Sequence, residues 1–540
     1  MSVTKDSEGG VVSTTPDIEN VEAPITWRTY AICVFAAFGG IFYGYDSGYI
    51  GGVQGMKYFI HIIDGPDAVA LTSWKQSLIV SILSAGFFFG ALVAGDLADF
   101  FGRRTTIISG CVVFMVGVAL QTASAGLGLL VAGRLVAGLG YGLVAATIIM
   151  YMSEIAPRKV RGAVVSAYQF CITIGLLLAA CVTYGTEDFN DSSSYRIPMG
   201  LQLLFAIILG VGLVFLPETP RYFVKKGNVE AARNALSRVR GQDPTSHYID
   251  AELAEIIANH EYESRVIPST GYFGSWANCF TGSLFKANSN LRKTILGASL
   301  QMMQQWTGVN FVFYFSTPFL QSTGAISNVF LMSLIFTLVN VLSTPLSFWL
   351  VERFGRRPML IWGAIGMTVC EFIVAIIGVT IGFNKTHIVD GNTVADNLSA
   401  VNAQVAFIAI YIFFFATTWG PGAWVLIGEI FPLPIRSRGV ALSTASNSLW
   451  NCVIAVITPY LVNTDEANLR SSVFFLWGSL CAACFVYAYF LVPETKGLTL
   501  EQVDQMLDET VPRKSAAWKP TTTFVNELAR ADNAEKIAQE

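Results

Sequence analysis

The sequence predicts an all-α membrane protein of twelve transmembrane helices, arranged as two six-helix halves with short cytosolic helices between them. The chain has 540 residues, of which 53% are hydrophobic and 13% charged, whereas about 25% are charged in ordinary soluble domains. Twelve apolar stretches reach the length of about 20 residues that crosses a bilayer. Three pairs of motifs also recur in the same order in both halves. Together these observations exclude a soluble globular protein.

The predicted spans form an N-terminal bundle over 28–216 and a C-terminal bundle over 294–492. The apolar runs place them at 28–50, 76–98, 105–124, 127–151, 162–184, 198–216, 294–315, 326–350, 359–382, 403–427, 439–462 and 472–492. The polar linker 217–293 contains two amphipathic helix patterns, Asn228–Val239 and Asp250–His260. Cytosolic tails are expected at 1–27 and 493–540. Residues 1–26 lack the pattern of a cleavable signal peptide, so the first span is expected to direct membrane insertion.

The distribution of lysine and arginine predicts the orientation in the plasma membrane. With the N-terminus in the cytosol, the cytosolic segments hold 28 of the 34 basic residues and the outer loops hold five. Because cytoplasmic loops carry an excess of Lys and Arg, both termini are expected in the cytosol. Three glycosylation sequons then fall in outer loops, at Asn190, Asn384 and Asn397.

The two halves repeat each other at the ends of their spans. Gly-Arg-Arg occurs at 102–104 and 355–357, Glu-x-x-Pro-x-x-x-Arg at 154–161 and 429–436, and Pro-Glu-Thr at 217–219 and 493–495. Such repeats predict a pseudo-two-fold axis, with the functional site between the halves near the bilayer midplane. Within span 4, Gly138, Gly140 and Gly142 indicate close helix packing rather than a dinucleotide-binding loop.

Polar side chains inside spans must face the bundle interior, because lipid offers them no hydrogen-bond partner. The candidates are one aromatic ring and seven amides: Trp424, Gln169, Gln304, Gln305, Asn310, Asn340, Asn447 and Asn451. A straight helix would not aim Gln304, Gln305 and Asn310 at one ligand, and Gly308 between them would let the helix open. Alternatively, these amides join helices to each other.

Several motifs together resemble the sugar porter family of the major facilitator superfamily, over about 28–505. They are Gly95-Asp-Leu-Ala-Asp-x-x-Gly-Arg-Arg104, Gly133-Arg-x-x-x-Gly138, Pro217-Glu-Thr-Pro-Arg221, Gln304-Gln-x-x-Gly-x-Asn310 and Pro493-Glu-Thr-Lys-Gly497. Phe42–Gly48, Trp419–Trp424 and Arg196–Pro198 are most similar to fungal high-affinity glucose transporters. The resemblance implies sugar contacts at Gln169, Gln304, Gln305, Asn310, Asn340, Trp424 and Asn447. Asn451, four residues after Asn447, shares its helix face and is a further candidate. Ser448 departs from the tryptophan usual in this family.

Asp46 and Arg134 are the charges deepest in the N-terminal half. One unpaired charge at the bilayer centre costs about 2.5–3.5 kcal/mol, so the two are expected to pair with each other or with water. A carboxylate beside a movable arginine can change its affinity for a proton. The resemblance implies that Asp46 is the protonation site and Arg134 its partner; a static ion pair is the alternative. Glu371 in span 9 is expected to pack as a protonated side chain.

Acids and arginines alternate at the predicted cytosolic helix ends. The resemblance implies a salt-bridge network that closes the cytosolic side, formed by Asp99, Arg104, Glu154, Arg161, Glu218, Glu352, Arg356, Arg357, Glu429, Arg438 and Glu494. The alternative is ordinary positive-inside anchoring, to which Arg103 is assigned.

The sequence therefore predicts a plasma-membrane hexose transporter, with D-glucose as substrate, that works by alternating access as a proton symporter. A facilitated uniporter, a glucose sensor without transport and a quinate permease remain alternatives. The expected partners are sugar, proton and the lipid bilayer. With a net charge of −4 and no basic stripe, nucleic acid is not expected as a partner. No enzyme activity, cofactor or metal is predicted, because no nucleophile–base set or metal-ligand cluster occurs.

Overall fold

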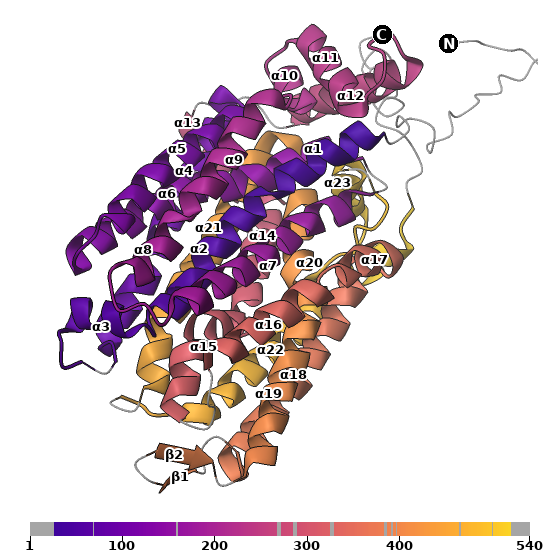
Figure 1. Cartoon of the computed structure of the whole chain (residues 1–540). Coiled ribbons are helices and arrows are strands. Elements are labelled where there is room, and N and C mark those ends of the chain that lie inside the picture. The colour runs from indigo at the N-terminus through magenta and orange to yellow at the C-terminus, as the bar shows by residue number, and fades with distance from the viewer. Residues whose placement is uncertain are drawn as a thin grey trace, which may run out of the picture.

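The computed structural model describes residues 26–519, except 69, 158–159, 267–271, 285–288, 324–328, 383–385, 390–391, 396, 464–465 and 499. The described chain is a bundle of long helices, with N-terminal helices beside C-terminal ones (Figure 1). The short linker helices α10–α12 cover one end of the bundle, and α3 with the β-hairpin lies at the other. These ends are called the linker end and the hairpin end below.

The helices of the N-terminal half are α1 (Trp27–Ala37), α2 (Gly39–Val53), α3 (Lys57–Asp64), α4 (Ser73–Phe101), α5 (Arg103–Thr122), α6 (Leu127–Ile155), α7 (Arg161–Thr186), α8 (Ser193–Gly200) and α9 (Gln202–Phe215). The linker contains α10 (Pro220–Lys225), α11 (Val229–Arg240), α12 (His247–Val266), α13 (Tyr272–Ala277) and the 3₁₀-helix η3 (Asn278–Phe280). Helices α11 and α12 overlap the two ranges predicted there.

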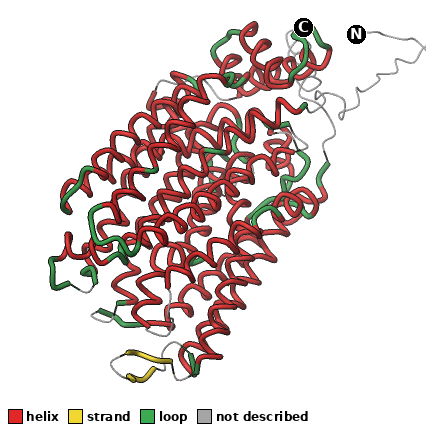
Figure 2. Tube along the Cα trace, in the orientation of Figure 1, coloured by secondary structure: helices red, strands yellow, loops and turns green. Residues whose placement is uncertain are grey.

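The C-terminal half contains α14 (Asn290–Trp306), α15 (Val309–Thr323), α16 (Val329–Ser343), α17 (Leu346–Arg353), α18 (Arg356–Thr380), α19 (Leu398–Thr417), α20 (Trp419–Glu429), α21 (Leu433–Val462), η4 (Arg470–Ser472) and α22 (Val473–Leu491). It is followed by α23 (Leu500–Glu509) and η5 (Pro512–Ala517). The strands β1 (Thr386–Val389) and β2 (Asn392–Ala395) pair antiparallel in the loop after α18, an addition to the predicted all-α fold (Figure 2).

Nine helical stretches in the described chain are long and apolar enough to cross a membrane, and the pair α16–α17, bent by 40°, makes a tenth. The two remaining predicted spans, 28–50 and 294–315, correspond to the broken pairs α1–α2 and α14–α15. Their sequences are rich in glycine, tyrosine and glutamine. Half-helices with polar side chains are typical of spans that line a transport site.

Glycine permits close contact between α4, α5 and α6. A Cβ built at Gly138 would lie 2.2 Å from the Leu83 carbonyl oxygen, and one at Gly142 would lie 2.3 Å from that of Phe87. A Cβ at Gly140 would lie 2.4 Å from the backbone nitrogen of Phe114 on α5. Only glycine allows backbones to approach so closely, which confirms the packing role predicted for this glycine series.

The two halves meet along several pairs of helices, among them α4 with α21, α6 with α21, α7 with α16, α17 and α20, and α2 with α15. Buried apolar side chains from both halves form one continuous core along these contacts. Helices α2, α7, α15, α16 and α20 therefore face the plane between the halves, where the sequence predicts the functional site.

Candidate functional site

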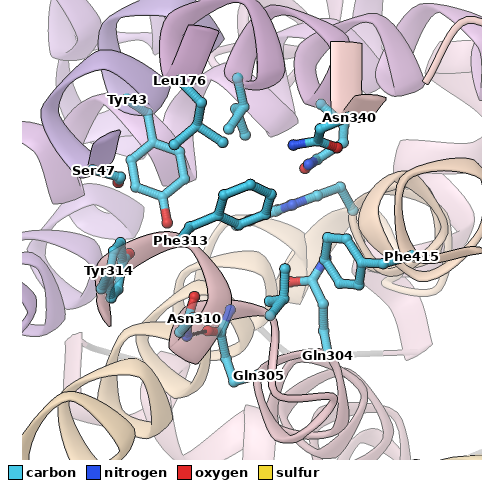
Figure 3. Close-up of a pocket in the computed structure, with 14 residues that line it drawn as sticks. Tyr43, Ser47, Leu176, Gln304, Gln305, Asn310, Phe313, Tyr314, Asn340 and Phe415 are labelled. Carbon is cyan, nitrogen blue, oxygen red and sulfur yellow. Dashed lines mark hydrogen bonds between the residues drawn. The ribbon is translucent and has the colours of Figure 1, made fainter. Parts of the chain in front are cut away.

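A cavity of about 50 Å³ lies between the two halves, smaller in this conformation than the roughly 300–1,000 Å³ typical of small-molecule sites. Its lining comes from α2, α7, α14, α15, α16, α19 and α20, and Figure 3 shows these side chains converging. The residues are Tyr43, Ser47, Gln169, Ile172, Leu176, Gln304, Gln305, Val309, Asn310, Phe313, Tyr314, Asn340, Phe415 and Trp424.

Span 7 is interrupted at Gly308, which has a φ of +84°. This left-handed conformation is readily adopted only by glycine. The break lets Gln305, on α14, accept a hydrogen bond from the amide of Asn310, on α15. Gln304, Gln305 and Asn310 therefore reach the same cavity, although a straight helix would point them in different directions.

The cavity amides are oriented by fixed partners. Gln304 Nε2 donates to the carbonyls of Gly420, at 2.8 Å, and Trp419, at 3.1 Å. Its Oε1 accepts from Asn447 Nδ2 at 2.9 Å. In contrast, Asn340 Oδ1 is buried and has no hydrogen-bond partner among the described residues. Since buried polar groups are normally hydrogen-bonded, this oxygen is available to a ligand hydroxyl.

Six of the eight predicted substrate residues line the cavity, while Asn447 and Asn451 lie behind it. Asn451 Nδ2 donates to the hydroxyl of Tyr314 at 3.1 Å, and its Oδ1 accepts from Ser84 Oγ, in the other half, at 2.8 Å. Both asparagines therefore support lining residues. Apart from Trp424, the prediction missed the aromatic lining, including Tyr43 and Tyr314. Tyr314 could have been found, because it lies four residues after Asn310 and so shares its helix face.

The expected ion pair between Asp46 and Arg134 does not form in this structure. Arg134 donates to the carbonyl of Ile79 at 2.7 Å and to the hydroxyl of Tyr49 at 2.6 Å. Tyr49 in turn donates to Gln121 Oε1 at 2.7 Å. Of the two expected arrangements, the direct pair is therefore absent, because Arg134 donates to neutral oxygens instead, and pairing through water stays a prediction. Asp46 is fully buried, and neither of its carboxylate oxygens has a hydrogen-bond partner among the described residues.

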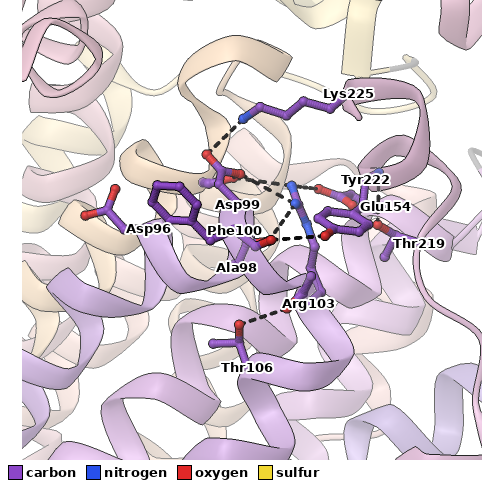
Figure 4. Close-up of polar contacts among 12 residues, drawn as sticks. Asp96, Ala98, Asp99, Phe100, Arg103, Thr106, Glu154, Thr219, Tyr222 and Lys225 are labelled. Carbon is purple, nitrogen blue, oxygen red and sulfur yellow. Dashed lines mark hydrogen bonds and ion pairs between the residues drawn. The ribbon is translucent and has the colours of Figure 1, made fainter. Parts of the chain in front are cut away.

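At the linker end, each half contains an equivalent buried ion pair. Arg103 Nη2 lies 2.9 Å from Glu154 Oε1 in the N-terminal half, and Arg356 Nη2 lies 2.8 Å from Glu429 Oε1 in the C-terminal half. Figure 4 shows Arg103 between Asp99 and Glu154, with Lys225 on the other side of Asp99. Asp99 is 3.5 Å from Arg103 and 2.8 Å from Lys225. Assigning Arg103 to simple anchoring was therefore wrong; its repeat equivalence to Arg356 was the available signal.

Two further predicted acids cap helices by the same arrangement in both halves. Glu218 Oε2 accepts from the backbone N–H of Arg104 at 3.0 Å, and Glu494 accepts from those of Arg356, at 3.0 Å, and Arg357, at 3.1 Å. A carboxylate at a helix N-terminus is favoured by the unpaired N–H groups and the helix dipole. Burial raises the pKa of Glu218, although the hydrogen bond from the backbone N–H of Arg104 acts in the opposite direction.

Arg104 and Arg357 do not join the halves. The guanidinium of Arg104 donates to the carbonyl of Leu216 at 3.0 Å, and that of Arg357 to the carbonyl of Tyr489 at 2.8 Å, each within its own half. Among the described residues the two guanidinium groups thus bond to carbonyls at helix ends of their own half, and their part in closing the cytosolic side stays a prediction. Arg161 is buried at the beginning of α7.

The halves are joined at the linker end by a cluster centred on Arg438 of α21. Arg438 lies 2.9 Å from Asp96 and 3.7 Å from Asp99, both on α4. Trp276 of linker helix α13 donates its Nε1–H to Asp96 at 3.1 Å, and its ring lies 5.7 Å from the Arg438 guanidinium. Asp99 also accepts from Ser437 Oγ at 2.6 Å. We call these five residues the linker-end cluster.

Other contacts between the halves lie outside this cluster. Glu352 of α17 accepts from the backbone N–H of Ala163 on α7 at 3.1 Å. A Cβ built at Gly51 of α2 would lie 3.1 Å from the carbonyl oxygen of Phe313 on α15. Asn463 Nδ2 donates to Ser73 Oγ at 2.9 Å, which joins the end of α21 to the beginning of α4. The halves are therefore in contact on both sides of the cavity.

Two of the three sequons are described. Asn190 and Asn397 are exposed. The Asn397 side-chain oxygen caps α19 by accepting from the Ala400 N–H at 3.1 Å. Asn384 lies outside the described residues.

Comparisons with known proteins cover nearly the whole chain. The family described as "Sugar (and other) transporter" matches residues 32–507. The chain is 44% identical over 502 residues to the major facilitator-type transporter ecdD of Aspergillus rugulosus, covering 92% of this chain and 90% of that protein. It is 41% identical over 497 residues to the probable glucose transporter rco-3 of Neurospora crassa, covering 90% and 79%.

Among solved structures, the fold is similar to that of the major facilitator proton:xylose symporter XylE bound to 6-bromo-6-deoxy-D-glucose. The TM-score is 0.74 at 24% sequence identity, covering 89% of this chain and 99% of that chain. The predicted fold of two six-helix halves is thereby confirmed.

Proposed function

Because the chain belongs to the sugar (and other) transporter family and is a sugar transporter of the major facilitator superfamily, we propose that it carries a hexose, D-glucose first, across the plasma membrane in symport with protons. The observation that carries this proposal is the cavity of amides and aromatic rings between the two halves. The molecule is a multi-pass carrier and not an enzyme.

The cavity chemistry suits a neutral polyol. Sugar hydroxyls both donate and accept hydrogen bonds, which matches the amides of Gln169, Gln305 and Asn340. The C–H faces of a sugar ring pack on aromatic rings such as those of Phe313 and Trp424. The lining contains no lysine or arginine among the described residues, so an anion such as quinate has no obvious counter-charge. The names of the Neurospora glucose transporter and of the glucose-analogue complex agree with a hexose.

Proton coupling is assigned to Asp46 and Arg134. Asp46 lies in α2 one residue before Ser47, which lines the cavity, and it is buried without a hydrogen-bond donor among the described residues. An uncompensated buried carboxylate is costly, so this arrangement favours uptake of a proton. Arg134 is held by Tyr49 and Ile79. When Asp46 loses its proton, movement of Arg134 toward it would compensate the charge and change the packing of α2.

Alternating access follows from the contacts at the two ends. Opening the linker end requires Arg438 to leave Asp96. The contact of Asn463 with Ser73, between the end of α21 and the beginning of α4, would continue to hold the other end. The distribution of lysine and arginine supports a cytosolic location for the linker end and for both termini. Opening of the hairpin end would then load sugar from outside.

Sugar uptake in a transporter-null cell tests the proposal. Cells expressing the chain are given labelled D-glucose, galactose, xylose, fructose or quinate while the external pH is recorded. We expect saturable D-glucose uptake accompanied by alkalinisation of the medium. Glucose uptake without a pH change would support the uniporter. Correct surface expression without uptake of any of the five compounds would contradict the proposal.

A further inference from the structure

A buried carboxyl group outside the cavity, that of Glu371 on α18, requires an explanation. Its side chain is 2% exposed, and it forms no ion pair with any described residue. Ionisable groups within membrane spans are costly, at about 2.5–3.5 kcal/mol each on insertion scales, and usually mark function. Neither the cavity nor the proton pathway proposed above uses this group.

Glu371 lies directly behind the break in span 7. A Cβ built at Gly308 would lie 3.1 Å from Glu371 Oε1 and 2.8 Å from Cγ of Trp477 on α22. Gly308 also has a positive φ, so a side chain there would be strained as well as crowded. The Glu371 carboxyl group and the Trp477 indole ring thus pack against the point where α14 meets α15.

Side chains around the break also donate hydrogen bonds to the backbone carbonyl that the break leaves without a partner in its own helix. The last carbonyls of a helix have no intrahelical partner. The Thr307 carbonyl accepts from the Tyr411 hydroxyl at 2.7 Å and from Cys481 Sγ at 3.5 Å. The Glu371 carboxyl group lies beside this carbonyl, because its Oε1 is 3.1 Å from a Cβ built at the next residue, Gly308. Glu371 therefore belongs to a polar shell around the broken backbone.

On its opposite side, the break faces the cavity. Gln304 and Gln305 precede it, Val309 and Asn310 follow it, and all four line the cavity. The angle between α14 and α15 therefore sets how these amides converge.

We propose that Glu371 is a positioning residue for substrate binding. It fixes the break at Gly308 and thereby aligns the amides of α14 and α15. This inference rests on the proposed function of the cavity as a hexose site.

Three variants of the full-length protein, purified in detergent, test the inference by D-glucose affinity. Glu371→Leu removes the polar contact, Glu371→Gln keeps shape and hydrogen bonding, and Thr368→Val changes a hydroxyl on the same helix that bonds only within that helix, to the Ala364 carbonyl. We expect Glu371→Leu to weaken binding about 3- to 10-fold, the effect of about one hydrogen bond. Binding by Glu371→Gln and Thr368→Val should stay within about twofold of wild type.

A double-mutant cycle separates positioning from general damage. Gly308→Ala disturbs the same break from the backbone side, so its effect on affinity and that of Glu371→Leu should be strongly non-additive. Additive effects, unchanged affinity in Glu371→Leu, or an equal loss in Thr368→Val would overturn the inference. If Glu371→Leu does not fold, Cys481→Ala replaces it in the same cycle, with the same expected loss and the same refuting outcomes.

Gln304→Ala distinguishes failure of this inference from failure of the proposed function. If Gln304→Ala weakens glucose binding and Glu371→Leu does not, only the positioning role fails. If the wild-type protein does not bind glucose, the hexose site itself is wrong, and the positioning role fails with it.

Discussion

Replacing Arg438 with glutamine should open the linker end of the transporter. Among the described residues, Arg438 makes the closest ion pair between the halves, at 2.9 Å from Asp96, and both side chains are nearly buried, at 10% and 12% exposed. Hydrogen bonds to charged groups contribute about 1.5–3 kcal/mol each. The two acids keep other donors, since Trp276 bonds to Asp96 and Lys225 to Asp99. We therefore expect the loss of one such bond rather than the cost of a stranded charge.

A change of this size would raise the ratio of open to closed linker ends roughly 10- to 150-fold. Ser153 provides a reporter position, because it is fully buried on α6 and a Cβ built at Gly428, in the other half, would lie 3.3 Å from its Cβ. Ser153→Cys is nearly isosteric and outside the ion pairs. The rate at which a water-soluble maleimide modifies this cysteine measures the open population, and peptide mass spectrometry separates it from the nine native cysteines.

The matched control is Arg238→Gln, which removes an exposed cation from linker helix α11. Its labelling rate should equal that of the Ser153→Cys parent. If Arg438→Gln also labels at the parental rate while it remains folded, Arg438 does not hold the linker end closed and the reasoning is refuted.

Three further predictions follow from other contacts. Asp46→Asn should abolish sugar accumulation driven by a proton gradient but preserve part of sugar counterflow; undiminished accumulation would exclude Asp46 as the proton carrier. Trp276→Phe keeps an aromatic ring but removes the hydrogen bond from the indole N–H to Asp96, so the Ser153→Cys labelling rate should rise roughly 2- to 10-fold. An unchanged labelling rate would show that Trp276 does not restrain opening of the linker end. Gln304→Ala should weaken D-glucose binding about 5- to 150-fold, a loss of about 1–3 kcal/mol, measured by calorimetry. If every deoxy-glucose loses the same affinity, Gln304 does not bond to a sugar hydroxyl and only joins α14 to the beginning of α20.

The fold was predictable because the bilayer imposes simple rules on the chain. The apolar lengths located the spans, and the repeated Gly-Arg-Arg and Pro-Glu-Thr motifs revealed the two halves. The broken pairs α1–α2 and α14–α15 were less visible as separate pieces, because hydropathy does not report where a helix bends. Gly308 was an exception, since the amides on both sides of it required a break. The β-hairpin after α18 escaped prediction because short strands in polar loops lack an apolar pattern.

The cavity was predicted in part. Amides in apolar spans are conspicuous, and five of the seven predicted amides line the cavity together with the predicted ring of Trp424. Tyr43 and Phe313 were not found, because aromatic residues are common in spans whether they face lipid, core or ligand. The partners of charged groups also could not be read from the sequence. Tyr49 receives Arg134 in place of Asp46, and Arg103 rather than Arg104 pairs with Glu154, because side-chain direction depends on the packed helices.

The most direct test of the central claim is D-glucose uptake by the purified protein in proteoliposomes under an imposed inward proton gradient. The account predicts that internal glucose rises above the external concentration, that a protonophore abolishes the excess, and that Asp46→Asn only equilibrates the sugar. Folded, reconstituted protein that gives no glucose uptake would contradict the assignment of the cavity as a hexose site, and uptake that never exceeds the external concentration would contradict proton symport.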